Sequence, residues 1–214
     1  MKAEFWHERW QSNRIGFHNA EVNQKLARNL SRLTLDRGSQ IFVPLCGKSR
    51  DIGWLLKQGL YVVAIELSEI AVQQLFQELG IVPKVTELDL LKRFSSPQLE
   101  VFVGDIFDLT GELTGKIDAV YDRAALIALP VAMRQKYADT VSEISGYAPQ
   151  LLISIDYDQA EMDGPPFSVP RNEIAALYGT RYSVALLEST EVEGGLKGIC
   201  PAHEIVWHLT PADR

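Results

Sequence analysis

Residues 42–59, FVPLCGKSRDIGWLLKQG, join a strand-like run to a helical pattern through Gly47-Lys48-Ser49. A Gly-Lys-Ser turn in this position is typical of phosphate-binding loops, but such loops carry another glycine five residues before the second one. Phe42 holds that position here. A dinucleotide fingerprint needs three spaced glycines, whereas Gly47 stands alone between Leu45 and Gly53. The turn therefore indicates a ligand other than pyrophosphate.

Acidic residues stand where the predicted strands end. They are Glu66, Asp105, Asp122 and Asp156. Ligands of open α/β sheets bind outside the carboxyl ends of the strands, so we expect a crevice lined with carboxylates. Glu66 lies about twenty residues beyond the first turn, where an acidic side chain accepts hydrogen bonds from ribose hydroxyls. For Asp122 and Asp156 taken singly, helix capping or a solvated position is favoured.

A nucleoside that lacks phosphates and carries positive charge fits these residues better than NAD does. S-adenosylmethionine is such a molecule, because its ribose can pair with Glu66 and its sulfonium tolerates an acidic crevice. Arg123, next to Asp122 in YDRAAL, has two interpretations. It either pairs with a neighbouring carboxylate or holds a ligand's carboxylate through two parallel hydrogen bonds.

Composition narrows the classes of partner. The chain of 214 residues has 21 Lys and Arg against 28 Asp and Glu, a net charge of −7, which disfavours nucleic acid and anionic membranes. The apolar runs are too short for a membrane span and the N-terminus lacks the apolar region of a secretory signal, so we expect a cytoplasmic protein. Cys46 and Cys200 have no clustered partners, so we expect packing roles and no metal.

From residue 41 onward, β-like runs alternate with helical patterns, which predicts a parallel sheet with crossover helices. Ser49 and Ser68 are predicted to cap two of the helices, which end at Gly59 and Gly80. The last two strands are expected to form an antiparallel hairpin at the sheet edge. The seven predicted strands are residues 41–45, 61–66, 99–104, 116–122, 150–158, 182–190 and 203–210.

Residues 1–38 precede the first strand and are expected to form a helical extension of a single domain that spans residues 1–214. Trp6, Trp10 and Phe17 are concentrated there. The two tryptophans, four residues apart, either anchor a helix to the core or belong to a lid over a ligand, and the spacing alone favours the anchor.

Several segments together resemble the thiopurine S-methyltransferase family, including its bacterial members. In chain order they are FWHERW, IGFH, PLCGKSRDIGWL, VVAIELSE, IFDL, YDRAAL, YADT and GPPFSVP, from residue 5 to about residue 170. The resemblance implies a Rossmann-like class I S-adenosylmethionine-dependent methyltransferase fold, with a mostly parallel seven-stranded sheet, an antiparallel edge strand and helices on both faces. It also implies that the N-terminal segment covers the site.

The resemblance implies methyl transfer from S-adenosylmethionine, which leaves S-adenosylhomocysteine, to small aromatic or heterocyclic thiols such as thiopurines. In bacteria it extends to selenium and tellurium compounds and their detoxification. An NAD-dependent oxidoreductase and a non-catalytic nucleoside-cofactor-binding module stay as alternatives. Nothing in the pattern demands more than a monomer with a small-molecule acceptor.

The resemblance also assigns residues. Trp10 and the backbone of Leu45 would contact the methionine part of the cofactor, with Gly47 letting the chain turn close to it. The resemblance also assigns Glu66 to the ribose, Asp105 and Ile106 to the adenine, Arg123 to the cofactor and the substrate, and Phe17 and His18 to the acceptor. We further expect the charge of Arg123 to favour an acceptor thiolate over the thiol by lowering the pKa of the thiol. The family's animal enzymes carry a second arginine near the C-terminal hairpin, whereas EGGLKGICPAH has none and Lys197 is its nearest cation.

Overall fold

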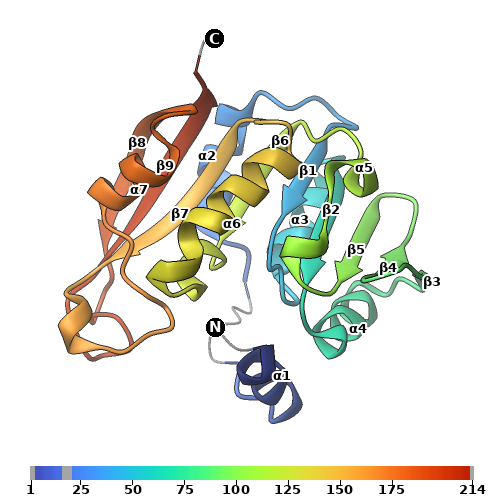
Figure 1. The fold of residues 1–214 in the computed structure, drawn as a ribbon, viewed down its shortest axis with the longest axis horizontal. Coiled ribbons are helices and arrows are strands. Elements are labelled where there is room, and N and C mark those ends of the chain that lie inside the picture. The colour runs from blue at the N-terminus through green and yellow to red at the C-terminus, as the bar shows by residue number, and fades with distance from the viewer. Residues whose placement is uncertain (1–2, 16–20, 213–214) are drawn as a thin grey trace.

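Nine strands form one mixed sheet in the computed structural model, which describes residues 3–15 and 21–212 (Figure 1). Their order across the described sheet is β3-β4-β5-β2-β1-β6-β7-β9-β8. The strands are β1 (Gln40–Val43), β2 (Tyr61–Glu66), β3 (Lys84–Glu87), β4 (Lys92–Ser95), β5 (Leu99–Val103), β6 (Ala119–Arg123), β7 (Gln150–Asp156), β8 (Tyr182–Glu191) and β9 (His203–Pro211).

The five central strands, from β5 to β7, are parallel, and antiparallel strands flank them on both sides. β9 pairs with β7 and β8 pairs with β9, which confirms the predicted C-terminal hairpin. At the other edge, β3 and β4 form a hairpin next to β5 that the prediction of seven strands missed. Its segments KVTE and KRFS are mostly polar and only partly buried, so they lack the apolar alternation that marks a strand.

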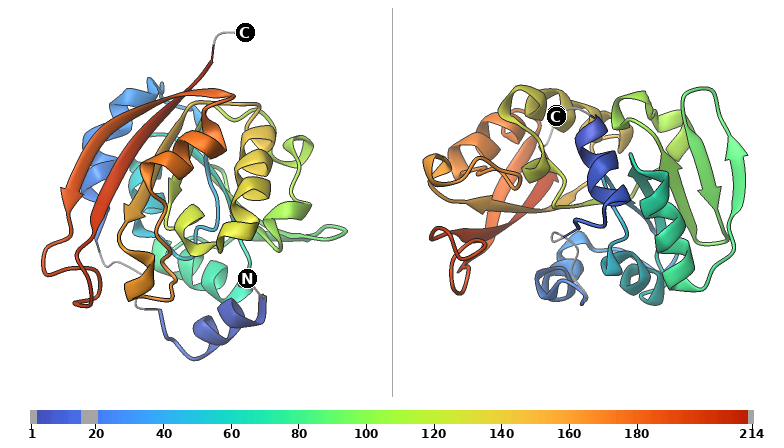
Figure 2. Two further views of the ribbon diagram at one scale, coloured as in Figure 1. Left: turned by 60° about the vertical axis from the view of Figure 1, so that its left-hand side comes forward. Right: turned by 90° about the horizontal axis from the view of Figure 1, so that it is seen from below.

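Helices cover both faces of the sheet, as predicted. In the right-hand view of Figure 2, α6 and α7 lie above the strands and α2, α3 and α4 lie below them. The helical segments are α1 (Ala3–Gln11), α2 (Gln24–Asn29), η1 (Leu30–Leu33), α3 (Arg50–Lys57), α4 (Glu69–Leu79), η2 (Ile106–Asp108), α5 (Gly111–Thr114), η3 (Leu126–Ala128), α6 (Val131–Ile144), η4 (Gln159–Glu161) and α7 (Arg171–Tyr178). None of these described helices is long and apolar enough to cross a membrane.

The period of two in the strands divides the core between the two faces. Phe42 packs in the cluster that includes Tyr137 of α6, whereas its neighbours Ile41 and Val43 pack in the cluster that includes Leu55 of α3. Successive side chains of a strand point to opposite faces, so a strand buried on both sides is continuously apolar. The strand predictions succeeded where this rule applied.

The N-terminal segment divides into two parts. Leu26 and Leu33, from α2 and η1, are buried in the core cluster below the sheet. Asn23 caps α2 through its side chain, and its backbone N–H donates to Asp51 at 2.8 Å. In contrast, α1 lies off the sheet beside α4, on the side where the parallel strands end (Figure 1). α2 and η1 therefore anchor the N-terminal segment to the core, whereas α1 lies at the carboxyl ends of the parallel strands.

Asp122, next to last in β6, is fully buried. Its carboxylate accepts hydrogen bonds from the Tyr137 hydroxyl at 2.7 Å and from the Leu126 N–H at 3.2 Å. Burial raises the pKa of Asp122 to about 6, although these hydrogen bonds oppose the rise. The structural role favoured from the sequence agrees with these contacts, but Asp122 holds the turn after β6 from inside the core rather than from solvent.

The pH dependence of stability tests this burial. A carboxyl whose folded pKa is raised stabilises the fold fully below its unfolded pKa of 3.8 and loses that contribution as the pH rises through about 6. Between about pH 4.5 and about pH 7, the unfolding free energy of the wild type should therefore fall by about 2 kcal/mol relative to that of Asp122→Asn. Urea denaturation at both pH values measures the difference.

Asp118→Asn provides the control, because Lys116 lowers the pKa of Asp118 chiefly through a side-chain hydrogen bond. Folding shifts the pKa of Asp118 in the opposite direction from that of Asp122. The stability of the wild type relative to Asp118→Asn should therefore not fall over the same pH range. A constant difference between the wild type and Asp122→Asn would contradict the raised pKa of Asp122.

Candidate active site

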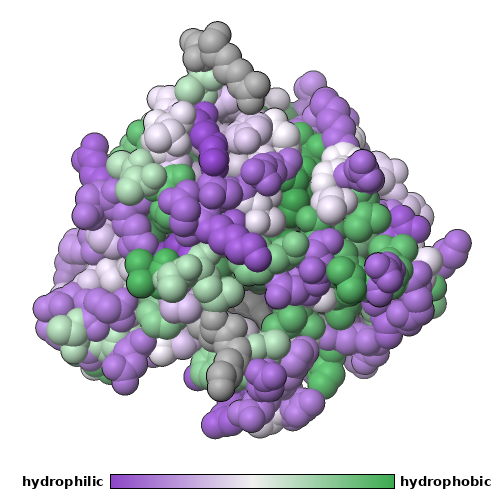
Figure 3. Space-filling model, viewed as in Figure 1, coloured by the Kyte–Doolittle hydropathy of each residue, from purple (hydrophilic) through white to green (hydrophobic). Residues whose placement is uncertain are grey.

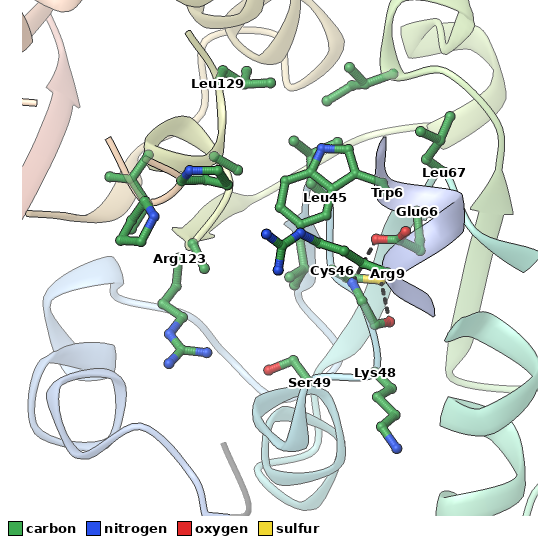
Figure 4. A pocket seen from close by; sticks show the side chains of 18 of the residues that line it. Trp6, Arg9, Leu45, Cys46, Lys48, Ser49, Glu66, Leu67, Arg123 and Leu129 are labelled. Carbon is green, nitrogen blue, oxygen red and sulfur yellow. Dashed lines mark hydrogen bonds between the residues drawn. The ribbon is translucent and has the colours of Figure 1, made fainter. Parts of the chain in front are cut away.

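A cavity of about 580 Å³ lies at the carboxyl ends of the parallel strands. Its walls come from the turn after β1, the ends of β2 and β6, the segment after β5, and α1 (Figure 4). The outer surface of α1, at the bottom of Figure 3, is hydrophilic, whereas the cavity wall is mainly apolar. This size and lining are typical of a site for a small organic ligand.

The turn after β1 has an unusual backbone. Leu45 and Gly47 both have positive φ, 45° and 52°. This region costs about 1–2 kcal/mol for a residue with a side chain, and such residues cluster at ligand sites. The Cys46 N–H donates to the Ile65 carbonyl at 3.0 Å, which fixes the turn to β2. Leu45 lines the cavity at the position predicted from the sequence.

Lys48 and Ser49 have ordinary structural roles. The Lys48 ammonium lies 2.8 Å from a carboxylate oxygen of Glu78 in α4. Ser49 caps α3, since its hydroxyl accepts a hydrogen bond from the Asp51 N–H. The prediction that Gly-Lys-Ser is not a phosphate loop agrees with both contacts.

Trp10 packs directly on this turn. It is buried, lines the cavity, and is so close to Gly47 that a β-carbon there would lie 3.1 Å from the indole ring. Trp10 was expected either to anchor a helix to the core or to belong to a lid over a ligand. Its side chain both anchors α1 and forms part of the cavity wall. Trp6 lines the cavity as well.

Glu66 ends β2 and is 6% exposed. Its two carboxylate oxygens accept hydrogen bonds from the N–H groups of Gly47 and Ser68, both at 2.9 Å. Burial raises the pKa of Glu66, and these backbone hydrogen bonds oppose the rise. Each oxygen of an ionised carboxylate can accept a further hydrogen bond, so Glu66 keeps capacity for a ligand hydroxyl.

Asp105 and Ile106 follow β5 and line the same cavity. The Asp105 carboxylate accepts a hydrogen bond from the Phe107 N–H at 3.0 Å and thereby starts η2. Arg123, the last residue of β6, lies on the other side of the cavity from Glu66 (Figure 4). The structure thus brings together six predicted residues, which are Trp10, Leu45, Gly47, Glu66, Asp105 and Ile106, with Arg123 facing them.

The expectation that all four strand-end acids line the crevice is wrong for Asp122 and Asp156, for which a structural role was favoured when each was taken singly. Asp122 is buried behind the cavity, and Asp156 lines a separate depression and accepts a hydrogen bond from the Ser168 hydroxyl. The cavity is therefore not lined by all four strand-end acids, because side chains alternate between the faces of each strand. Phe17 and His18 lie outside the described residues. Within the described chain, no three His, Cys, Asp or Glu side chains gather as a metal site.

Residues that the sequence prediction did not single out also line the cavity. Arg9 extends into it from α1, and Pro165 and Pro166 form part of its wall beside Lys197, which the sequence already offered as the nearest cation of its segment. The Lys197 ammonium donates a hydrogen bond to the Pro165 carbonyl at 2.9 Å. FWHERW was a visible signal for Arg9, but only the placement of α1 shows which of its side chains face inward.

A family model described as Thiopurine S-methyltransferase (TPMT) matches residues 1–200. The chain is 51% identical over 213 residues to a thiopurine S-methyltransferase of Xanthobacter autotrophicus, with 99% of this chain and 100% of the relative covered. It is 50% identical to the enzyme of the same name from Teredinibacter turnerae, with 98% of both chains covered. The chain belongs to the thiopurine S-methyltransferase family.

Solved structures agree with this family's fold. The 1,6-didemethyltoxoflavin-N1-methyltransferase of Burkholderia thailandensis, solved with bound 1,6-didemethyltoxoflavin and S-adenosylhomocysteine, has a TM-score of 0.67 at 16% identity, covering 97% of this chain and 87% of that one. The magnesium protoporphyrin IX methyltransferase of Synechocystis, with bound S-adenosylmethionine, has a TM-score of 0.64 at 15% identity, covering 97% and 96%. The predicted class I methyltransferase fold is confirmed. As a member of this family, the chain is a methyltransferase whose methyl donor is S-adenosylmethionine.

Replacing Gly47 tests the contact between α1 and the turn. Gly47→Ala places a side chain at positive φ and against Trp10, so it should lower the unfolding free energy by about 1–2 kcal/mol and weaken S-adenosylhomocysteine binding about tenfold. Denaturation and calorimetric titration measure the two effects.

Gly80→Ala is the matched control, because Gly80 also has a positive φ of 68° but a β-carbon there has open space. It should lose stability without losing affinity. If Gly47→Ala bound S-adenosylhomocysteine as tightly as Gly80→Ala, the Trp10 contact would have no part in ligand binding.

Proposed function

We propose that this family member transfers the methyl group of S-adenosylmethionine to the sulfur of a small aromatic or heterocyclic thiol, with thiopurines as assay substrates. The products are a methyl thioether and S-adenosylhomocysteine. The observation that carries the proposal is the cavity in which the Glu66 carboxylate, tied to the backbone of Gly47, faces a mainly apolar wall.

The donor fits the residues at this end of the cavity. In the proposal, Glu66 accepts hydrogen bonds from the ribose hydroxyls, and Asp105 and Ile106 flank the adenine. Trp10 and the Leu45 carbonyl contact the methionine part. Support comes from the remaining acceptor capacity of Glu66 and from the positive φ of Leu45. The absence of a glycine-rich phosphate cradle disfavours NAD.

The acceptor lies on the opposite side of the cavity in this proposal. Arg123 provides positive charge there, and Ile127, Leu129, Met133 and Pro166 provide an apolar wall for a planar ring. Phe17 and His18 complete the acceptor side in the proposal, on the family resemblance alone. Lys197 supplies a second cation from the C-terminal hairpin, where the sequence has no second arginine.

S-adenosylmethionine, when bound, supplies a methyl group on a positively charged sulfur, so no protein nucleophile is required. The chain's contribution is to align the reactants and to exclude water, which accounts for much of the rate of reactions of this kind. α1, whose Trp6 and Trp10 line the cavity, covers the reactants as the lid of the domain. Arg123 lowers the pKa of the acceptor thiol, because a nearby cation favours the thiolate.

Three finer parts of the proposal rest on the sequence. They are the use of selenium and tellurium compounds in detoxification, a monomeric state and a cytoplasmic location. The two cysteines agree with the last, since both are free thiols in the structure.

Removal of the Glu66 carboxylate tests the donor site. Glu66→Gln should weaken S-adenosylhomocysteine binding about 100-fold, because a neutral amide replaces the charged acceptor of the ribose hydroxyls. Calorimetric titration measures this loss, and Glu69→Gln, which changes an acid of α4 paired with Lys92, is the control. Unchanged affinity in Glu66→Gln would remove the donor from this position.

Methyl transfer to heterocyclic thiols tests the activity itself and the role of Arg123. Arg123→Gln should reduce kcat/KM about tenfold for a thiol that is protonated at neutral pH and move the rise of its pH profile upward. A thiol already ionised at neutral pH should lose less. Equal losses with both thiols and an unshifted profile would contradict thiolate stabilisation, and no methyl transfer by the wild type to any aromatic thiol would overturn the proposed activity.

A further inference from the structure

Arg9 brings a cation into the cavity from α1. Its side chain extends from the helix into the space between Glu66 and Arg123 in Figure 4, and it is only partly exposed to solvent. A surface helix such as α1 has solvent on its outer side, where a long charged side chain is normally placed. The inward placement of Arg9 therefore calls for an explanation.

The guanidinium group of Arg9 lacks an anionic partner within the described chain. Its Nε is buried and has no hydrogen-bond partner there, and none of the ion pairs between described residues includes it. Its described contact is with the ring of Phe5, 4.5 Å from the centroid. A guanidinium has five N–H donors, and the planar anions that match its geometry are carboxylates and phosphates.

Arg123, the other arginine of the cavity wall, ends β6 on the side that the proposed function gives to the acceptor, and the two lysines of the wall already have partners. Lys48 pairs with Glu78, and Lys197 donates to the Pro165 carbonyl. Both would lose these contacts if they turned to a ligand. Arg9 loses little by binding a ligand anion, since its buried Nε is unsatisfied within the described chain.

The position of Arg9 selects the ligand group. It lines the same cavity as Trp10, which packs on Gly47 at the end that the proposed function gives to the methionine part of the donor. Glu66 and Asp105 occupy the end given to the ribose and adenine, where their charges repel an anion. The methionine part carries an α-carboxylate, which has the charge and planar shape that a guanidinium binds.

We propose that Arg9 binds the α-carboxylate of S-adenosylmethionine and thereby ties α1 to the bound donor. This inference rests on the proposed function, because it uses the placement of the methionine part. Bound donor then holds α1 over the cavity through a charged contact in addition to the packing of Trp10 on Gly47. Arg9 is a binding residue whose contribution depends on one functional group of the ligand.

The test compares S-adenosylmethionine with its decarboxylated form, which lacks only that carboxylate. By calorimetric titration, Arg9→Gln should bind S-adenosylmethionine about 10- to 100-fold more weakly than the wild type does. The wild type and Arg9→Gln should bind the decarboxylated form with the same affinity. Arg9→Lys should lie between, because it keeps the charge and loses the two-pronged geometry. Arg14→Gln is the matched control, since Arg14 contacts the exposed Ser12 hydroxyl and lies outside the cavity wall.

Each other result overturns the inference in its own way. An equal loss of affinity for both ligands would make Arg9 a structural residue of α1, and thermal unfolding of the variants would show the matching loss of stability. Unchanged donor affinity with a raised KM for the thiol would assign Arg9 to the acceptor. If the wild type bound neither donor form, the proposed function would fall first, and the inference with it.

Discussion

The carboxylate of Glu66 joins two turns that leave neighbouring strands. One oxygen receives the N–H of Gly47 after β1, and the other receives the N–H of Ser68 before α4. A carboxylate this deeply buried is unfavourable without such partners, and the two N–H groups would equally lack an acceptor without the carboxylate. Three features therefore depend on the side chain of Glu66: the turn that carries Leu45, the packing of Trp10 on Gly47, and the start of α4.

The acidic and basic side chains of the cavity wall come from different elements of the fold. Glu66 at the end of β2 and Asp105 after β5 line one part of the cavity, whereas Arg9 and Arg123 come from α1 and β6. An anionic group and a cationic group of the same bound molecule can each meet the opposite charge in this arrangement. The apolar wall between them raises the strength of both interactions, because it keeps water away.

Much of the fold was predictable from the sequence, and the reasons differ between residues. β2, α4 and the end of α4 at Gly80 follow from apolar periodicity and from the residue types at the turns, both of which can be read from the sequence alone. The place of Glu66 on the cavity wall was predictable because ligands of open α/β sheets bind outside the carboxyl ends of the strands, where Glu66 stands. The burial of Asp122 and the inward direction of Arg9 were not, because both depend on how a strand face or a helix is placed against distant elements.

The polar β3–β4 hairpin has a consequence for the sheet as a whole. Without it, the edge would be β5, whose Val101 and Phe102 are buried in the core. An apolar edge strand with free N–H and C=O groups invites pairing with another chain. β3 replaces that edge with a short strand that begins at Lys84 and ends at Glu87, and charges on an edge oppose such pairing. The hairpin thus adds Leu91 and Phe94 to the core and also gives the sheet an outer edge that disfavours pairing with another chain.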